Sequence, residues 1–305
     1  MGRVEWILLF ALAAIWGGSF FLYKVLVEHL PPLTVVLGRV SFAAIALLAI
    51  VYLSGLRMPT SPRAWGAFFV MGALNNVIPF TLIAWGETRI ASGLAAILNA
   101  TTPLFTILLA HVLTREERLT AKKIVGALFC LLGVIVLIGP SAVHRLSLGS
   151  IAQLAVLGAA ASYGFAGIYG RRFKDTSPLV TAAGQFSASA LLTIPLALAA
   201  DRPWRLAAPS WETWSAMLAL ALLCTAIAYV MYFRILAAAG ATNVSLVTFL
   251  VPIGALLLGI NFLGERLTAS DIAGMLLIFA GLAAIDGRAL ALLGRLRESR
   301  ERRAV

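Results

Sequence analysis

The sequence predicts an all-α polytopic membrane protein, with ten transmembrane helices arranged as two inverted-topology five-helix repeats. Three observations carry this prediction: the composition, the recurrence of long apolar runs, and an internal duplication. Of the 305 residues, 61% are hydrophobic and only 12% are charged, whereas soluble chains are typically about 25% charged. This composition excludes a soluble enzyme, a secreted disulfide scaffold and a disordered protein.

Ten apolar runs give the expected helices. Each has about 20 residues, enough to cross roughly 30 Å of hydrocarbon. Prolines and charged residues that end helices, such as Pro31-Pro32 and Gly139-Pro140, separate the runs. In chain order the runs are 6–27, 34–54, 64–86, 91–113, 121–139, 148–171, 178–200, 211–234, 242–263 and 269–286.

The basic residues predict the orientation. Alternate loops and the C-terminal tail place 17 Lys and Arg residues on one side and 6 on the other, with Arg39 inside the second run. The side richer in Lys and Arg is normally cytoplasmic, so both termini are expected in the cytoplasm. The net charge of +11 is then a product of topology, and no nucleic-acid partner is needed. The use of 20 Arg against 4 Lys suits a GC-rich bacterium, which gives the bacterial inner membrane as the expected location and the lipid bilayer as a partner.

An internal duplication divides the chain. The segment Glu117-Arg-Leu-Thr-Ala121 recurs as Glu265-Arg-Leu-Thr-Ala269, and several apolar and glycine positions repeat at the same offset of 148. The expected domains are a first repeat, 1–140, a second repeat, 141–288, and a basic cytoplasmic tail, 289–305. Because five is an odd number, the second repeat must enter the membrane upside down, as in many secondary transporters.

Several of these features resemble the EamA family of the drug/metabolite transporter superfamily. They are the opening segment 12–20 (Leu-Ala-Ala-Ile-Trp-Gly-Gly-Ser-Phe), the mid-run Pro103 and Pro252, and the two Glu-Arg-Leu-Thr turns followed by Ile-x-Gly. The resemblance implies ten helices, a central cavity between the halves, and export or exchange of amino acids and other small metabolites. The related small multidrug exporters carry a Glu in their first helix; the first run here has none, so their proton coupling is not transferred.

Polar residues beside the paired prolines are the first candidates for the substrate site. A proline leaves a carbonyl unpaired in the preceding turn, and that carbonyl must face protein or a wet cavity. Asn99 lies one turn before Pro103 and Thr248 one turn before Pro252, so each pair is expected on one cavity-lining face. A plain kink is the alternative interpretation.

Two further groups of candidates come from the third, eighth and first runs. Of the adjacent Asn75 and Asn76, whose counterparts are Cys224 and Thr225, one is expected to join helices and the other to face the cavity; Asn76 is assigned to the cavity. Aromatic side chains could stack on a substrate with an apolar body, or could simply pack. They are Trp16, Tyr163, Tyr229 and Tyr232.

Two charged residues are assigned a possible charge role. Arg39 is expected to extend its long side chain outward, toward Glu28 or Glu87; alternatively it holds a substrate carboxylate. No acidic residue is expected at mid-membrane, which favours facilitated efflux or exchange without proton coupling. Glu87, near the outer end of the third run, is the least unsuitable proton carrier, but pairing with Arg39 or Arg89 would keep it ionised. Glu117 and Glu265 are interpreted as structural residues of the two turns.

The predicted function is therefore a secondary transporter that exports or exchanges small organic metabolites, such as amino acids, by alternating access. No catalytic residue, metal ligand set or cofactor is expected, because phosphate-binding and hydrolase motifs are missing from the sequence. The alternatives are a nucleotide-sugar or drug-type permease of the same architecture, a membrane-embedded enzyme, and a metabolite sensor.

Overall fold

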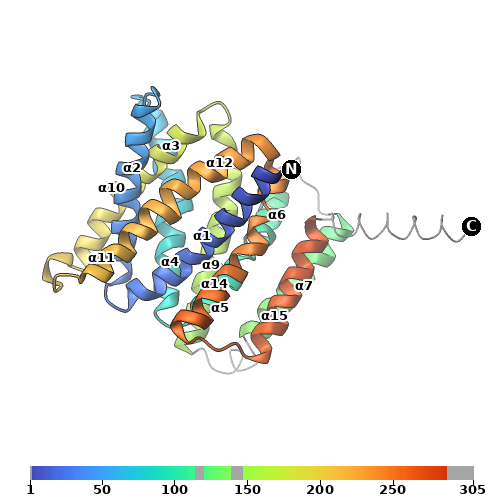
Figure 1. Cartoon of the computed structure of the whole chain (residues 1–305). Helices are drawn as coiled ribbons and strands as arrows, with labels where there is room; N and C mark the ends of the chain where they lie inside the picture. Colours follow the sequence, from blue (N-terminus) through green and yellow to red (C-terminus); the bar gives the residue numbers. More distant parts are fainter. Residues whose placement is uncertain (1, 114–119, 139–146, 287–305) are drawn as a thin grey trace, which may run out of the picture.

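The computed structural model describes residues 2–113, 120–138 and 147–286, and these residues form an all-helical bundle with no strand (Figure 1). The labelled helices are α1 (Arg3–Val27), α2 (Pro32–Leu53), α3 (Pro62–Gly72), α4 (Ile78–Glu87), α5 (Ser92–Asn99), α6 (Thr102–Leu113), α7 (Ala121–Ile138), α9 (Leu148–Tyr169), α10 (Pro178–Ala200), α11 (Trp211–Leu218), α12 (Ala228–Ala239), α13 (Ala241–Val244), α14 (Val247–Leu263) and α15 (Ala269–Asp286).

Eight helical stretches in the described residues are long and apolar enough to cross a membrane. They coincide with the first eight runs of the sequence, so the multi-pass helical class is confirmed. The ninth and tenth runs correspond to shorter apolar helices, Val247–Leu263 and Ala269–Ile285. The ninth run is shortened because a turn at Ser245 and Leu246 separates α13 from α14. A count of ten full-length spans is thus a prediction that the helix lengths do not confirm.

Serine and proline residues begin several of the helices. Ser61, Ser147 and Ser210 accept hydrogen bonds from the backbone N–H three residues later, at 3.1–3.3 Å, and so cap α3, α9 and α11. Proline occupies the first turn of α2, α3 and α10, where its missing N–H costs nothing. The breaks at these described positions are therefore real helix boundaries, whereas Gly139-Pro140 lies outside the described residues.

Two spans contain π-helical segments at corresponding places in the two halves. The segment η1 (Ala73–Val77) joins α3 to α4, and η4 (Ala219–Ile227) joins α11 to α12. Within η4 the Thr225 hydroxyl donates to the Leu220 carbonyl five residues earlier, at 2.9 Å. π-Helical turns of this kind frequently occur at functional sites, because they re-aim the side chains around them.

A proline interrupts the span that α5 and α6 form. Pro103 has no N–H for the Asn99 carbonyl, and the Thr102 hydroxyl donates to that carbonyl instead, at 2.7 Å. The corresponding Pro252 lies inside α14 without breaking it, and the break in its span comes at Ser245 and Leu246. The two halves thus share a discontinuous span with different positions of the break.

The two halves are joined by closely packed helix pairs. In α7 and α15, which lie side by side at the edge of the bundle (Figure 1), Gly126 faces Gly281 and Gly133 faces Gly274. A Cβ at Gly133 would lie 2.7 Å from the Gly274 carbonyl oxygen, so only glycine permits this approach. Gly17 of α1 is packed in the same way against the backbone of α14.

The connections fall on two sides of the bundle. In Figure 1 the start of α1, the end of α15 and the α9–α10 connection lie on one side, and the α14–α15 connection lies on the opposite side. The side that holds the start of α1 and the end of α15 will be called the terminal side. This arrangement positions the cavity described next.

Candidate functional site

A cavity of about 780 Å³ lies between the two halves of the bundle. Side chains from α1, α2, η1, α4 and α5 line it together with side chains from α9, α10, α12 and α14. No described residue of α7 or α15 lines it, and these two helices pack on each other through their glycines. A volume of this size suits a small organic molecule.

The cavity reaches the terminal side of the bundle. Its lining includes Phe173, Lys174 and Thr176, which belong to the α9–α10 connection on that side. Lys174 is exposed there. The α9–α10 connection therefore forms the mouth of the cavity.

Hydrogen bonds between the halves close the opposite side. The Glu265 carboxylate, from the α14–α15 connection, accepts from the backbone N–H groups of Ser92 at 2.6 Å and Gly93 at 3.1 Å, which begin α5. Within the first half, the Lys24 ammonium at the end of α1 also donates to the carbonyls of Glu87 and Ile90 on this side, at 2.7 and 3.2 Å. A carboxylate at a helix N-terminus is favourable in both hydrogen bonding and charge. Glu265 is thus more than a turn residue: it ties the second half to the first.

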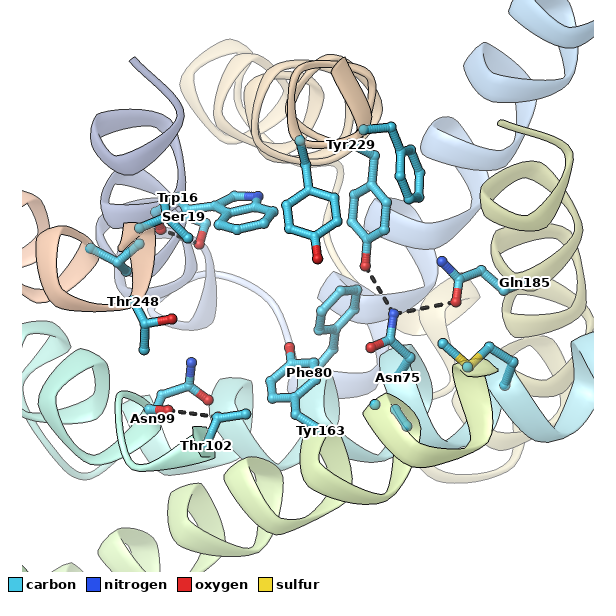
Figure 2. Close-up of a pocket in the computed structure, with 18 of the residues that line it drawn as sticks. Trp16, Ser19, Asn75, Phe80, Asn99, Thr102, Tyr163, Gln185, Tyr229 and Thr248 are labelled. Atoms are coloured by element: carbon cyan, nitrogen blue, oxygen red, sulfur yellow. Dashed lines mark hydrogen bonds between the residues drawn. The ribbon is translucent and has the colours of Figure 1, made fainter. Parts of the chain in front are cut away.

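An amide cluster occupies one end of the cavity (Figure 2). The Asn75 amide nitrogen donates to the Tyr229 hydroxyl at 2.9 Å and to Gln185 Oε1 at 3.2 Å. Asn76 is fully buried, does not line the cavity, and donates to the Ser189 hydroxyl at 2.9 Å. The expectation that Asn76 faces the cavity is therefore corrected: Asn76 joins the helices and Asn75 faces the cavity.

Asn99, Thr102 and Thr248 form a second polar group, at the other end of the view in Figure 2. Asn99 and Thr102 come from the interrupted span, and Thr248 comes from the start of α14. The side-chain oxygen of Asn99 is buried without a hydrogen-bond partner in the described chain. This end of the cavity thus retains an unused acceptor.

Aromatic rings form much of the wall between these polar groups (Figure 2). The ring of Trp16 lies 6.4 Å from that of Tyr229 and 5.6 Å from that of Tyr232, measured between centroids. Tyr163 and Phe80 line the cavity across from them. The rings pack on one another and also face the cavity, so the packing and stacking interpretations of the sequence are compatible.

Arg39 does not extend outward, contrary to the prediction. It lines the cavity, is 5% exposed, and donates from Nε to the Thr225 hydroxyl at 2.9 Å. Its guanidinium carbon lies 3.8 Å from the centroid of the Phe80 ring and 5.0 Å from that of Tyr23. Neither Glu28 nor Glu87 forms an ion pair with it. Inside the bundle, the Thr225 hydroxyl and the faces of the two rings provide the contacts that the prediction had placed at the membrane surface.

Glu87 is fully buried and does not line the cavity. Both oxygens of its carboxyl group lack a hydrogen-bond partner in the described chain. The Lys24 ammonium donates to the backbone oxygen of Glu87 and not to the carboxyl group. Glu87 thus belongs to the closed side of the bundle, next to the Glu265 contact.

The structure brings most of the predicted site residues to one cavity. Of the substrate-site candidates, Trp16, Asn99, Tyr163, Tyr229, Thr248 and Pro252 line it, as does Arg39. Asn76, Pro103, Thr225 and Glu87 do not line it. Sequence reasoning missed Ser19, Tyr23, Asn75, Thr102 and Gln185 as lining residues. The duplication does place Gln185 opposite Arg39, so the internal repeat held a signal for that residue.

A membrane-crossing helical bundle whose two related halves enclose a solute-sized cavity is typical of the class of small-solute transporters. The family model of EamA-like transporters matches residues 4–139 and again residues 150–285. The chain therefore belongs to the EamA-like transporter family, with one copy of the family unit in each half.

Relatives of similar length have transporter names. The chain is 29% identical over 287 residues to YedA, an "uncharacterized inner membrane transporter" of Escherichia coli, with 92% of this chain and 90% of that protein covered. It is 28% identical over 291 residues to a "probable amino-acid metabolite efflux pump" of Salmonella typhimurium, with 92% and 94% covered. A solved crystal structure matches with a TM-score of 0.67 at 19% identity, covering 97% of this chain and 99% of that one, which supports the fold.

Proposed function

We propose that this protein is a secondary transporter that exports or exchanges small organic metabolites, such as amino acids, across the bacterial plasma membrane by alternating access. The observation that carries the proposal is the cavity, which both repeats line, which reaches the terminal side, and which hydrogen bonds between the repeats close on the other side. Rocking of one repeat against the other would exchange the open and closed sides.

The proposed topology has ten membrane helices in two inverted repeats, with the termini and the tail at 289–305 in the cytoplasm. The matched family units and the Gly17, Gly126 and Gly133 contacts between the halves support a pseudo-symmetric pair. The cavity as described would then open to the cytoplasm.

Thiol labelling tests this orientation. A cysteine at the exposed Trp204 is expected to react with an impermeant reagent from outside the cell, and one at Arg172 only after the membrane is opened. The reverse pattern would place the mouth of the cavity outside.

The proposed substrate site comprises the lining candidates Trp16, Asn99, Tyr163, Tyr229, Thr248 and Pro252. Ring faces suit an apolar body, and amide and hydroxyl groups suit polar substituents. The printed name of the Salmonella relative supports metabolite efflux as the direction and amino acids as one substrate group.

Counterflow in proteoliposomes is the decisive experiment. Purified protein is reconstituted in vesicles loaded with a pooled library of amino acids, organic acids, nucleotide sugars and drug-like cations, and entry of labelled pool members is followed. Protein-free vesicles are the control. Counterflow restricted to nucleotide sugars or drugs would replace the proposed substrate class with that of the alternative permeases. Binding without any counterflow would indicate a sensor and contradict the transporter proposal.

A further inference from the structure

The cavity contains one deeply placed cation that forms no ion pair with a carboxylate of the described chain. Arg39 is 5% exposed and lines the cavity, and its hydrogen-bond acceptor is the neutral Thr225 hydroxyl. No carboxylate of the described residues forms an ion pair with its guanidinium. The faces of Phe80 and Tyr23 compensate part of the charge, but rings carry no net charge.

A second unsatisfied group lies beside this cation. Tyr23 lines the cavity, is 1% exposed, and its hydroxyl has no hydrogen-bond partner in the described chain. Buried charges are normally paired and buried hydroxyls normally bonded, because leaving them alone is costly. The two oxygens of a ligand carboxylate would pair with the guanidinium. One of these oxygens could also accept a hydrogen bond from the Tyr23 hydroxyl.

From this geometry we infer that Arg39, with Tyr23 beside it, is an anion subsite and that the preferred substrate is a monocarboxylate anion with an aromatic or other apolar body. A guanidinium presents a planar fork that matches a carboxylate. One deep cation balances one negative charge. A phosphate dianion would leave a negative charge uncompensated, since the second cation of the lining, Lys174, lies exposed at the mouth.

The same charge balance disfavours a zwitterion. No carboxylate is among the described residues that line the cavity, so an ammonium group there would find only neutral acceptors such as Asn99. A carboxylate without an ammonium group leaves the occupied cavity neutral at its deep end. The inference therefore narrows the proposed function from amino acids toward organic acids. Its transport consequence rests on that proposal, but the binding preference does not.

Thr225 has a positioning role in this subsite. It does not line the cavity, but its hydroxyl accepts from Arg39 Nε while donating to the Leu220 carbonyl within η4. The π-helical turn thus holds an acceptor in the place that orients the guanidinium. The other nitrogens of Arg39 have no carbonyl or carboxylate acceptor in the described chain, and the Tyr23 side chain interacts with the guanidinium beside them.

The test compares three probes built on one phenylpropyl skeleton: 3-phenylpropionate, its neutral amide 3-phenylpropionamide, and zwitterionic L-phenylalanine. Their dissociation constants are measured by calorimetry with the purified full-length protein in lipid nanodiscs. The expected order is 3-phenylpropionate tightest, by at least about tenfold over both other probes. A variant Arg39→Gln is expected to reduce the ratio of amide to carboxylate dissociation constants to within about threefold.

A matched control separates the subsite from general electrostatics. Lys174→Gln removes the same charge from the mouth and is expected to keep the wild-type ratio. If Arg39→Gln does not fold, Arg39→Lys and Tyr23→Phe give the second measurement, each expected to lower carboxylate affinity while the amide affinity stays within about twofold. The inference is overturned if the wild type does not bind 3-phenylpropionate, if it binds the amide or the zwitterion as tightly, or if the preference survives loss of Arg39.

The outcome also separates this inference from the proposed function. A carboxylate preference without counterflow would sink the transporter proposal and leave the subsite standing. Counterflow of metabolites with no preference for carboxylates would support the transporter proposal and overturn the carboxylate subsite.

Discussion

Loss of the Glu265 carboxylate should release the closed side of the cavity. Glu265 spans the two repeats by accepting from the Ser92 and Gly93 backbone N–H groups at 2.6 and 3.1 Å. Hydrogen bonds to a charged group contribute about 1.5–3 kcal/mol each. If the open conformation breaks both bonds and exposes their groups to water, the lower value gives ~3 kcal/mol for the pair. At about 1.4 kcal/mol per tenfold change, Glu265→Ala should raise the population open on that side by roughly 100-fold relative to the closed one.

Labelling of a cavity cysteine measures this shift. Thr248→Cys is introduced in a background where the two buried native cysteines, Cys130 and Cys224, are alanine. An impermeant maleimide is applied from the side of the α14–α15 connection, and the labelling rate is compared with and without Glu265→Ala. An increase of ten- to a hundredfold is expected. Glu265→Gln, which keeps one acceptor but no charge, should give an intermediate rate.

A matched carboxylate provides the control for this experiment. Glu212, at the start of α11, is exposed, so Glu212→Ala should leave the labelling rate within about twofold. An unchanged rate in Glu265→Ala, or an equal increase in Glu212→Ala, would refute the view that the Glu265 bonds hold this side closed.

Two further predictions concern the site and the packing. Asn99→Leu and Thr248→Val are each expected to reduce counterflow at least about fivefold with unchanged yield of folded protein, because both line one polar end of the cavity; unchanged rates in both would move the site elsewhere. Gly133→Ala is expected to lower the thermal midpoint of unfolding, because its Cβ would lie 2.7 Å from the Gly274 oxygen and overpacking costs about 1–3 kcal/mol. The control Gly66→Ala, whose Cβ would have no neighbour within 4 Å, should not lower the midpoint. Equal effects of the two variants would count against close packing of α7 on α15.

Much of the fold could be predicted from the sequence, because helix breaks and repeats are local or periodic signals. Pro31 precedes α2 and Pro32 begins it, and the second Glu-Arg-Leu-Thr segment, 265–268, falls between α14 and α15. Gly126 and Gly133, which are among the repeated glycine positions, pack α7 against α15. Such signals do not depend on how distant parts of the chain meet.

The assignment of Asn76 to the cavity failed for a physical reason. Successive residues of a helix point in directions about 100° apart, so the side that each of two adjacent asparagines faces depends on the local twist. The π-helical segment η1 contains both asparagines and changes that twist. Asn75 is thereby directed at the cavity and Asn76 at Ser189. The sequence around the two asparagines contains no pattern from which we could predict a π-helical turn.

The direction of Arg39 was also beyond sequence reasoning. An arginine on a single helix in lipid reaches for the nearest polar surface. In the bundle its acceptor is Thr225, 186 residues further along the chain. The sequence indicates that a charge inside a span is costly, but it does not show that a cavity and the Thr225 hydroxyl lie beside Arg39.

The driving force is the last property for which the structure gives an argument. A proton-coupled exchanger needs a group that substrate and proton reach in turn. Glu87 does not line the cavity and is fully buried, so it cannot exchange a proton for a substrate in this conformation. A monocarboxylate anion needs no such partner, because a membrane potential of 100 mV, negative inside, favours its exit by about 2.3 kcal/mol, close to a 50-fold concentration ratio.

We therefore expect export that follows the membrane potential and the substrate gradient but not the proton gradient. Proteoliposomes loaded with 3-phenylpropionate are given a proton gradient with the potential clamped by potassium and valinomycin, and then a potential with the pH equal on both sides. Efflux should respond to the second condition alone, and Glu87→Gln should leave that response unchanged. Accumulation driven by the proton gradient at clamped potential, and abolished in Glu87→Gln, would show that a buried carboxyl outside the cavity carries the proton after all, and that the closed side opens far enough during transport to load it.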